Sequence, residues 1–414
     1  MKDKRALAHI EKIEWVKPIE GADNIELIGV LGWRCIAKKG EFNVGDVCVY
    51  IEIDSKVPET EEFEFLRPKH FKIKTMKLNK FKDEYGDPIV SQGIAIPDKL
   101  FDSLYNKEKL LHKYRIGDDV TDVLGVTYYN PDDRRRKSDE REYKYDSMKS
   151  RHKNIFSKPF VKKMMKYKWF REFMFFFFGK KKDSPKKFPS WIQKTDEERI
   201  ENLPQYLNDH DTVWIMTEKI DGTSTTYAIE KKCGVWDFIV CSRNLRINSP
   251  NQKVWHSENV YWDIANKYNM ENVLNQIAKK ALDVEKLKKV KRVVLQGETY
   301  GYKLQGNPYK MNDIDFAAFN LTIEGVTKWG QPFKRKYITG DICEYLEGTN
   351  VKCVPILGTY TFPEGISMHD FKLEANGKSV LADVKREGIV YRNVEDARQS
   401  FKNVSNDYLL SKKE

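Results

Sequence analysis

A series of strand-like runs between residues 188 and 414 limits the choice of fold more than any other feature of the sequence. Apolar residues repeat with a period of two in strands and of about 3.6 in helices. Helical patterns separate the runs, as in YWDIANKYNMENVLNQIAKKALDVEKLKKV over residues 261–290. We therefore predict an α+β fold with antiparallel sheets flanked by helices. The strand-like runs are TVWIMTEKI, DFIVCSRNL, RVVLQGETYG, DFAAFNLTI and EGIVYRNV.

Residues 1–130 show a different pattern, in which short alternating strands are separated by turn signals. Examples are IELIGVLGWRCIAKKG, EFNVGDVCVYIEID and QGIAIPDKL. Several short strands at close spacing are typical of a small barrel or sandwich, so we expect an OB-like β-barrel domain here. Barrels of this kind bind nucleic acid in some proteins and serve as scaffold in others, and the pattern leaves both roles open.

Residues 131–187 form a basic, aromatic linker or insert between these two predicted domains, of which the second covers residues 188–414. Between Arg151 and Lys187 there are thirteen Lys or Arg residues and two acidic residues. Aromatic rings beside ammonium groups bind single-stranded nucleic acid by stacking and phosphate neutralisation. Alternatively, a basic amphipathic helix packs its Phe and Trp residues onto the barrel or a partner. We favour packing because large aromatic side chains are more often core than platform.

The charge balance and the cysteine pattern narrow the class of protein. A formal net charge of +11 favours a polyanionic partner, nucleic acid ahead of an acidic membrane. The six cysteines include no CxxC pair, which argues against a disulfide framework or structural metal and fits a reducing cytoplasm. The run FMFFFF has six residues, whereas a membrane span needs about 20, so we expect no membrane crossing.

Five polar clusters lie at or near the ends of the strand-like runs. Each has a simple structural interpretation when taken alone: Asp221-Gly222 is a common hairpin turn, and the glutamates stand near glycines in turn-like contexts. The alternative for the first cluster is that Lys219 is a covalent nucleophile. The clusters are Glu218-Lys219-Ile220-Asp221-Gly222, Arg243 in CSRN, Glu298 in LQGETYG, Glu387 in EGIVYR and Lys402 in SFKNVSNDYLL.

In their order along the chain, these clusters resemble the motifs of the covalent nucleotidyltransferases, which comprise ATP-dependent DNA ligases, RNA ligases and mRNA capping enzymes. EKIDGT resembles motif I (KxDG), CSRN motif Ia, QGE motif III, FAAFNL motif IIIa, EGIVYR motif IV and SFKNVSNDYLL motif V. KTDEERIENLP resembles the lead-in of RNA ligases, and the barrel-like domain precedes the motifs. The chain therefore resembles the RNA ligases of the Deinococcus and Naegleria type, except over residues 131–187.

The resemblance implies three steps: a lysine attacks the α-phosphate of ATP, AMP passes to an RNA 5′-phosphate, and a 3′-hydroxyl displaces AMP. Lys219 would be the adenylated residue. A lysine with its ordinary pKa is protonated at pH 7, and neighbouring acids favour that charged form. Mg²⁺ or Mn²⁺ beside the lysine would oppose this effect and neutralise the phosphates under attack.

The resemblance also assigns the other motif residues. Arg243 would contact the RNA 5′-phosphate or the adenylate, and Lys402 would neutralise the α-phosphate in the transition state. Glu218 would lie beside the adenine and Phe319 would stack on it, with Phe316 as the second choice. The predicted nucleotide-binding residues are Glu218, Gly222, Ser224, Glu298, Phe319 and Lys402. The predicted metal ligands are Asp221, Glu298 and Glu387.

Two positions depart from the family pattern. Motif IIIa commonly ends in Phe-Asp, whereas Asn320 follows Phe319 here. Motif V commonly has two lysines, and the first corresponds to Ser400. The second departure would place more of the phosphate neutralisation on Lys402, with Arg392 or a terminal lysine as helper.

We predict a monomeric, ATP-dependent RNA ligase that seals 3′-hydroxyl and 5′-phosphate RNA ends, including those of a nicked duplex, and serves in RNA repair. One alternative is a ligase-like nucleotidyltransferase that acts on nicked DNA or RNA/DNA hybrids. Another is a nucleic-acid-binding homologue that has lost its chemistry, which would bind RNA with a steep salt dependence and without adenylation.

Overall fold

The computed structural model describes residues 6–97, 114–129, 153–156, 158–167, 169–170, 172–174, 186–250, 252 and 259–411. The chain divides into two compact units, each built from separate segments. The first contains residues 1–130, 194–220 and 355–414, and the second contains residues 131–193 and 221–354. The predicted domain boundaries at residues 130 and 187 stay a prediction.

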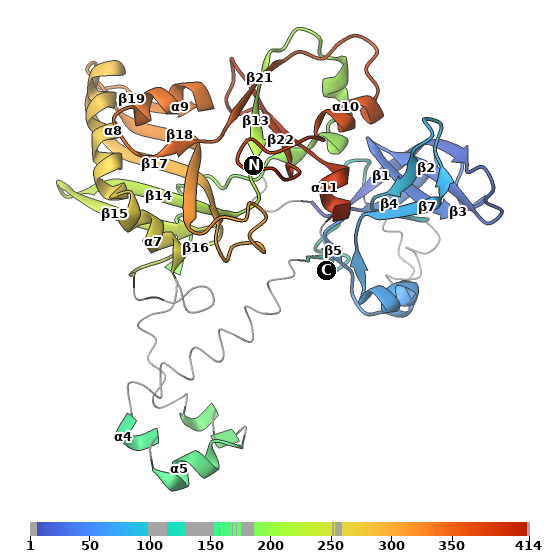
Figure 1. Ribbon diagram of the computed structural model, residues 1–414, viewed down its shortest axis with the longest axis horizontal. Helices are drawn as coiled ribbons and strands as arrows, with labels where there is room; N and C mark the ends of the chain where they lie inside the picture. Colours follow the sequence, from blue (N-terminus) through green and yellow to red (C-terminus); the bar gives the residue numbers. More distant parts are fainter. Residues whose placement is uncertain are drawn as a thin grey trace. The chain divides into compact units, whose positions relative to one another are not determined.

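The N-terminal part of the first unit is a five-stranded antiparallel sheet in the order β3-β2-β1-β4-β9 (Figure 1). The long strand β1 pairs with β4 over Ala8–Lys12 and with β2 from Ile13 to Pro18, and a register shift lies between Ile13 and Trp15 in the part paired with β2. Such an irregularity bends a strand locally. The short strands predicted here are confirmed. They are β1 (Ala8–Pro18), β2 (Ile25–Val30), β3 (Trp33–Lys38), β4 (Val47–Ile51) and β9 (Ile94–Pro97).

Smaller elements complete this part of the unit. A short sheet has the order β10-β5-β6, and a separate hairpin is made of β7 and β8. The elements are β5 (Ser55–Lys56), the 3₁₀ helix η1 (Glu61–Lys69), β6 (Lys72–Ile73), β7 (Met76–Lys82), β8 (Pro88–Ser91) and β10 (Thr127–Tyr128).

A second sheet of the first unit has the order β12-β23-β22-β13-β21. One of its faces packs on an aromatic core that includes Trp214, Tyr391 and Phe401. Side chains alternate between the faces of a strand, so the odd-numbered residues of β13 point away from this core. The elements are β12 (Glu198–Arg199), η3 (Ile200–Asn202), η4 (Pro204–Asn208), β13 (Trp214–Lys219), β21 (Ile356–Tyr360), α10 (Met368–Glu374), β22 (Gly388–Asn393), β23 (Ser400–Val404) and α11 (Asn406–Ser411).

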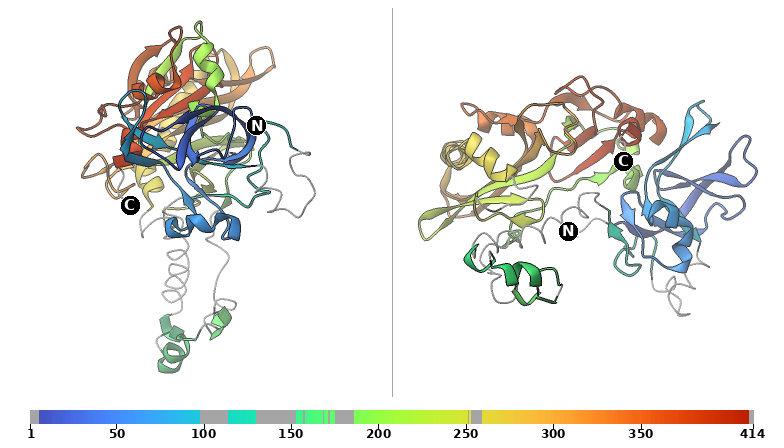
Figure 2. Two further views of the ribbon diagram at one scale, coloured as in Figure 1. Left: turned by 90° about the vertical axis from the view of Figure 1, so that its right-hand side faces the viewer. Right: turned by 60° about the horizontal axis from the view of Figure 1, so that its bottom comes forward.

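The second unit is built on an eight-stranded sheet in the order β11-β16-β15-β14-β17-β18-β19, with β20 paired to β18. Helices α7, α8 and α9 pack on one face of it and share its main core (Figures 1 and 2). The predicted α+β fold is confirmed. The elements are β11 (Lys186–Lys187), β14 (Thr223–Lys232), β15 (Val235–Ser242), β16 (Leu245–Arg246), α7 (Val260–Lys267), α8 (Met270–Val284), β17 (Leu287–Gly301), β18 (Ile314–Thr327), β19 (Pro332–Tyr337), α9 (Thr339–Leu346) and β20 (Lys352–Cys353).

The helix predicted over residues 261–290 is two helices followed by the start of a strand. Asn269 separates α7 from α8 with a φ of 48°, a left-handed conformation that asparagine tolerates better than most residues. After α8, Lys286 has a φ of 51°, and β17 begins at Leu287. The prediction was wrong for residues 287–290, because pairing with β18 overrides the local helical pattern.

Two predictions from composition can be compared with the structure. All six cysteines are free, as expected. In the described parts of the chain, no helix is both long enough and apolar enough to cross a bilayer. Residues 175–178 of the FMFFFF run lie outside those parts.

Candidate active site

Strand register brings the two predicted catalytic lysines to the same face of one sheet. Lys219 is the last residue of β13 and lies opposite Gly388 of β22. Two residues earlier on β13, Thr217 lies opposite Val390, which in turn lies opposite Lys402 of β23. Paired residues share a face and alternate residues return to it, so Lys219 and Lys402 both point away from the aromatic core.

Lys219 forms an ion pair with Glu387, the residue that precedes β22. Its Nζ lies 2.7 Å from Glu387 Oε1, and the lysine side chain is 25% exposed. A carboxylate at this distance favours the charged ammonium over the neutral amine. The amine therefore needs an additional positive charge nearby before it can act as a nucleophile.

Two consecutive acids pair with cations on the same face. Lys402 Nζ lies 3.1 Å from Asp196 Oδ1, and Arg392 Nη2 lies 2.9 Å from Glu197 Oε1. The side chains of both cations are largely buried. Sequence reasoning considered Arg392 only as a helper and did not select Asp196 or Glu197. Their only signal was membership of the KTDEERIENLP stretch, because the partners lie about 200 residues later in the chain.

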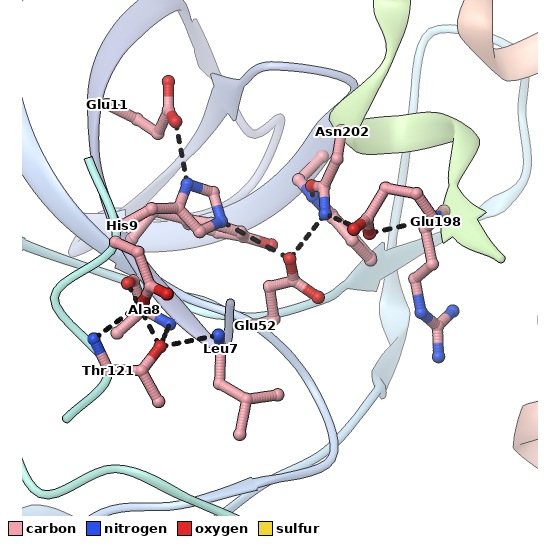
Figure 3. Close-up of polar contacts among 12 residues, drawn as sticks. Leu7, Ala8, His9, Glu11, Glu52, Thr121, Glu198 and Asn202 are labelled. Atoms are coloured by element: carbon pink, nitrogen blue, oxygen red, sulfur yellow. Dashed lines mark hydrogen bonds and ion pairs between the residues drawn. The ribbon is translucent and has the colours of Figure 1, made fainter. Parts of the chain in front are cut away.

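A buried polar network anchors the segment that carries these two acids to the N-terminal sheet (Figure 3). The side-chain amide of Asn202 donates to Glu52 Oε1 at 2.5 Å and to Glu198 Oε1 at 2.9 Å. His9 places Nδ1 2.8 Å from Glu11 and Nε2 3.4 Å from Glu52. Burial opposes the positive charge of His9, but the hydrogen bonds and charges of the two glutamates outweigh it and raise the pKa of His9 to about 9.

Glu218 points to the opposite side of the sheet from Lys219. Its carboxylate accepts hydrogen bonds from Ser379 Oγ at 2.5 Å and from the Val380 backbone N–H at 2.8 Å. The residue is almost fully buried. Alternation along β13 explains this direction, since adjacent residues face opposite sides. Its predicted place beside the adenine stays a prediction.

The Asp221-Gly222 pair does not form the turn of a simple hairpin. Strand β13, which precedes it, pairs with β21 and β22, whereas β14, which follows it, pairs with β15 and β17. The Asp221 backbone N–H donates to the Tyr309 hydroxyl at 2.8 Å. A Cβ at Gly222 would lie 2.3 Å from the Thr299 carbonyl oxygen, so the close approach to β17 requires glycine.

Ser224 and Glu298 share a face of the large sheet. They are register partners on β14 and β17, and both are half-buried. Two residues away on each strand, Gln296 Nε2 donates to Thr226 Oγ1 at 3.3 Å. The face opposite the helices therefore carries a continuous polar strip across these two strands.

A β-bulge places Phe319. Gln296 pairs with Asn320, but the next residue of β17, Gly297, pairs with Ala318, so Phe319 is the extra residue. A bulge of this kind redirects a side chain, and Phe319 remains half-buried. The Asn320 amide donates to Gln296 Oε1 at 3.2 Å, a contact that an aspartate carboxylate could not make as donor.

Phe316 and Arg243 occupy contrasting environments. Phe316 is fully buried in the core under the helices, where its ring meets Tyr227 edge-on at 5.4 Å between centroids. It therefore serves the core. Arg243 is exposed between β15 and β16.

The predicted metal ligands are divided between the units, with Glu387 in the first and Asp221 and Glu298 in the second. Among the residues that the structure describes, no three His, Cys, Asp or Glu side chains gather into a metal-binding group. Mg²⁺ ordinarily keeps several waters and uses one or two carboxylates together with phosphates. Single carboxylates such as Glu387 and Glu298 suit an ion bound in that way.

Two family models match parts of the chain. Residues 7–98 match a model of an OB-fold domain, and residues 212–404 match the RNA ligase family. No curated protein is a significant match to the sequence.

Solved structures of an RNA ligase from Naegleria gruberi resemble the whole chain. A ligand-free variant shares 26% identity with it at a TM-score of 0.68, and the comparison covers 99% of both chains. A variant with ATP and Mn also shares 26% identity at a TM-score of 0.68, and the comparison covers 99% of this chain and 100% of the Naegleria chain. A variant with AMP and Mn shares 27% identity at a TM-score of 0.68 and covers 99% of both chains.

Proposed function

We propose that this chain uses ATP and a divalent cation to seal RNA ends with a 3′-hydroxyl and a 5′-phosphate. It belongs to the RNA ligases that join an N-terminal OB-fold domain to a ligase domain. The observation that carries the proposal is the shared sheet face of Lys219 and Lys402, with Glu387 2.7 Å from the Lys219 amine. The ATP, AMP and Mn in the Naegleria structures support the choice of substrate and metal.

In the first step, the neutral Lys219 amine attacks the α-phosphorus of ATP. A P–N bond forms, the bond to the bridging oxygen breaks, and pyrophosphate leaves with the electron pair of that bond. The neutral amine carries two protons, and its nitrogen gives one of them to solvent when the P–N bond has formed. Lys402 supplies positive charge for the oxygens that become more negative in the transition state.

Control of the Lys219 proton is the physical problem of this step. Glu387 favours the ammonium in the resting protein. A divalent cation, when bound, supplies positive charge that favours the neutral amine and screens the phosphates. Of the proposed ligands, Glu387 contacts the nucleophile directly, and Asp221 and Glu298 belong to the second unit.

The nucleotide-binding roles follow the motif positions. Glu298 and Ser224 would meet the ribose or phosphates from the polar strip, Phe319 would stack on adenine, and Gly222 would allow close backbone approach. Arg243 would contact the RNA 5′-phosphate, which suits an exposed guanidinium. Glu218 would act on the adenine side, with its carboxylate fixed by the loop that it binds.

In the second and third steps, the RNA 5′-phosphate takes AMP from Lys219 and releases the amine, and a 3′-hydroxyl then displaces AMP and forms the phosphodiester. Repair of broken RNA by a monomer is the role that we propose. The six free cysteines favour a reducing compartment such as the cytoplasm.

Incubation with ATP radiolabelled at the α-phosphate, followed by a denaturing gel, tests the first step. Wild type should retain label, and Lys219→Ala should retain none. The control is Lys378→Ala, which removes a highly exposed lysine of the same unit and should label normally. An unlabelled wild type, or full labelling of Lys219→Ala, would refute the proposal.

A ligation panel tests the acceptor. Nicked duplexes that carry either RNA or DNA at the 3′-hydroxyl side should show efficient sealing with RNA. Equal or faster sealing with DNA there would favour the alternative of a ligase for nicked DNA or hybrids.

A further inference from the structure

The described part of segment 153–174 forms a small helical group (Figures 1 and 2). It includes α4 (Lys153–Phe156) and α5 (Pro159–Met164). Phe156, Met165 and Met174 are buried together, with Ile155, Val161 and Phe170 packed against them. The aliphatic and methionine side chains of the group therefore lie mostly inward.

Four aromatic side chains of the same segment are exposed instead. Phe160 is 67% exposed, Trp169 60%, Tyr167 54% and Phe173 50%. Burial of an aromatic side chain is strongly favourable, so neighbouring exposed rings commonly mark a binding surface. Packing, which the sequence favoured for this segment's aromatics, therefore holds for Phe156 and Phe170 but not for the exposed rings.

Lysines accompany these rings along the chain. Lys158, Lys163 and Lys166 are all exposed, so three ammonium groups and three exposed rings lie within residues 158–169. A ring stacks on a base, and an ammonium neutralises a phosphate. One short segment therefore offers both kinds of group that a single strand of nucleic acid needs.

We propose that this aromatic-lysine surface, defined as Lys158, Phe160, Lys163, Lys166, Tyr167 and Trp169, binds a single-stranded part of the RNA substrate. The choice of RNA rests on the proposed function. The chain's net charge of +11 favours a polyanionic partner. A lipid surface fits less well, because interfacial helices insert a continuous apolar face, whereas α5 has six residues and turns Val161 toward the small core.

Two variants of the full chain test the surface. The aromatic variant combines Phe160→Ser, Tyr167→Ser and Trp169→Ser, and the lysine variant combines Lys158→Gln, Lys163→Gln and Lys166→Gln. The matched control is Trp329→Ser, which removes a tryptophan that is 90% exposed on the β18–β19 connection.

Fluorescence anisotropy with a labelled single-stranded RNA lacking a 5′-phosphate measures binding without reaction. The aromatic variant should bind the RNA about 5- to 150-fold more weakly for each base that loses its stacking partner. The lysine variant should lower the slope of log affinity against log salt by about 2, since each phosphate contact on a single strand contributes about 0.7. Trp329→Ser should match wild type.

Labelling by ATP separates this proposal from the proposed function. Both variants should become adenylated like wild type, which also shows that they are folded. If wild type fails to become adenylated, the ligase function fails, whereas the RNA affinities still report on the surface. Unchanged RNA affinity and salt slope in both variants would overturn the surface proposal. Loss of binding to phosphatidylserine vesicles with unchanged RNA affinity would also overturn it and identify a membrane surface.

Discussion

His9 should make the stability of the first unit depend on pH. The pKa of His9 is about 9 in the fold and 6.5 for an ordinary histidine, which corresponds to about 3 kcal/mol. His9 is buried, so solvent screens this contribution little. Because the folded pKa is the higher one, the stabilisation is fully present below pH 6.5 and is lost as the pH rises through 9.

Denaturant unfolding of wild type and His9→Gln at pH 6 and pH 9.5 measures this effect. The wild type should lose about 3 kcal/mol more than the variant between these pH values, because glutamine cannot titrate. The control is His70→Asn, which removes an exposed histidine with a φ of 52° and should behave like wild type. Equal losses in wild type and His9→Gln, or an NMR titration of His9 near pH 6.5, would refute the reasoning.

Two further predictions concern the candidate site. Gly222→Ala should destabilise the protein by about 1–3 kcal/mol and slow adenylation, because the new Cβ would lie 2.3 Å from the Thr299 carbonyl oxygen. The control is Gly340→Ala, whose Cβ would have no neighbour within 4 Å. In a thermal melt this variant should be as stable as wild type or slightly more stable. Asp196→Ala should slow adenylation about tenfold with a smaller change in the KM for ATP, because Lys402 loses the carboxylate oxygen that lies 3.1 Å from its Nζ. Asp396→Ala, which breaks a surface pair, should leave the rate unchanged, and equal rates for the two variants would contradict a positioning role for Asp196.

Local sequence pattern predicted five strands of the C-terminal half of the chain, namely β13, β15, β17, β18 and β22. Strand-like runs identified β13, β15 and β17, because β-branched and apolar residues recur in them with the short period of a strand. The helix predicted from the apolar pattern was wrong at residues 287–290, where helical periodicity continues but the backbone pairs with β18. It also left the hairpin interpretation of Asp221-Gly222 open, since a turn dipeptide does not say which strands pair around it.

The sequence by itself determined which residues are available for chemistry: one lysine in KxDG, one in the motif V stretch, and the acids between them. Only the tertiary structure decided that β22 lies between β13 and β23, which puts Lys219 and Lys402 on one face and turns Glu218 to the other. The physical reason is that backbone hydrogen bonds are the same for every pairing, so the choice of partner strands and of the buried face depends on how apolar faces from distant parts of the chain pack together.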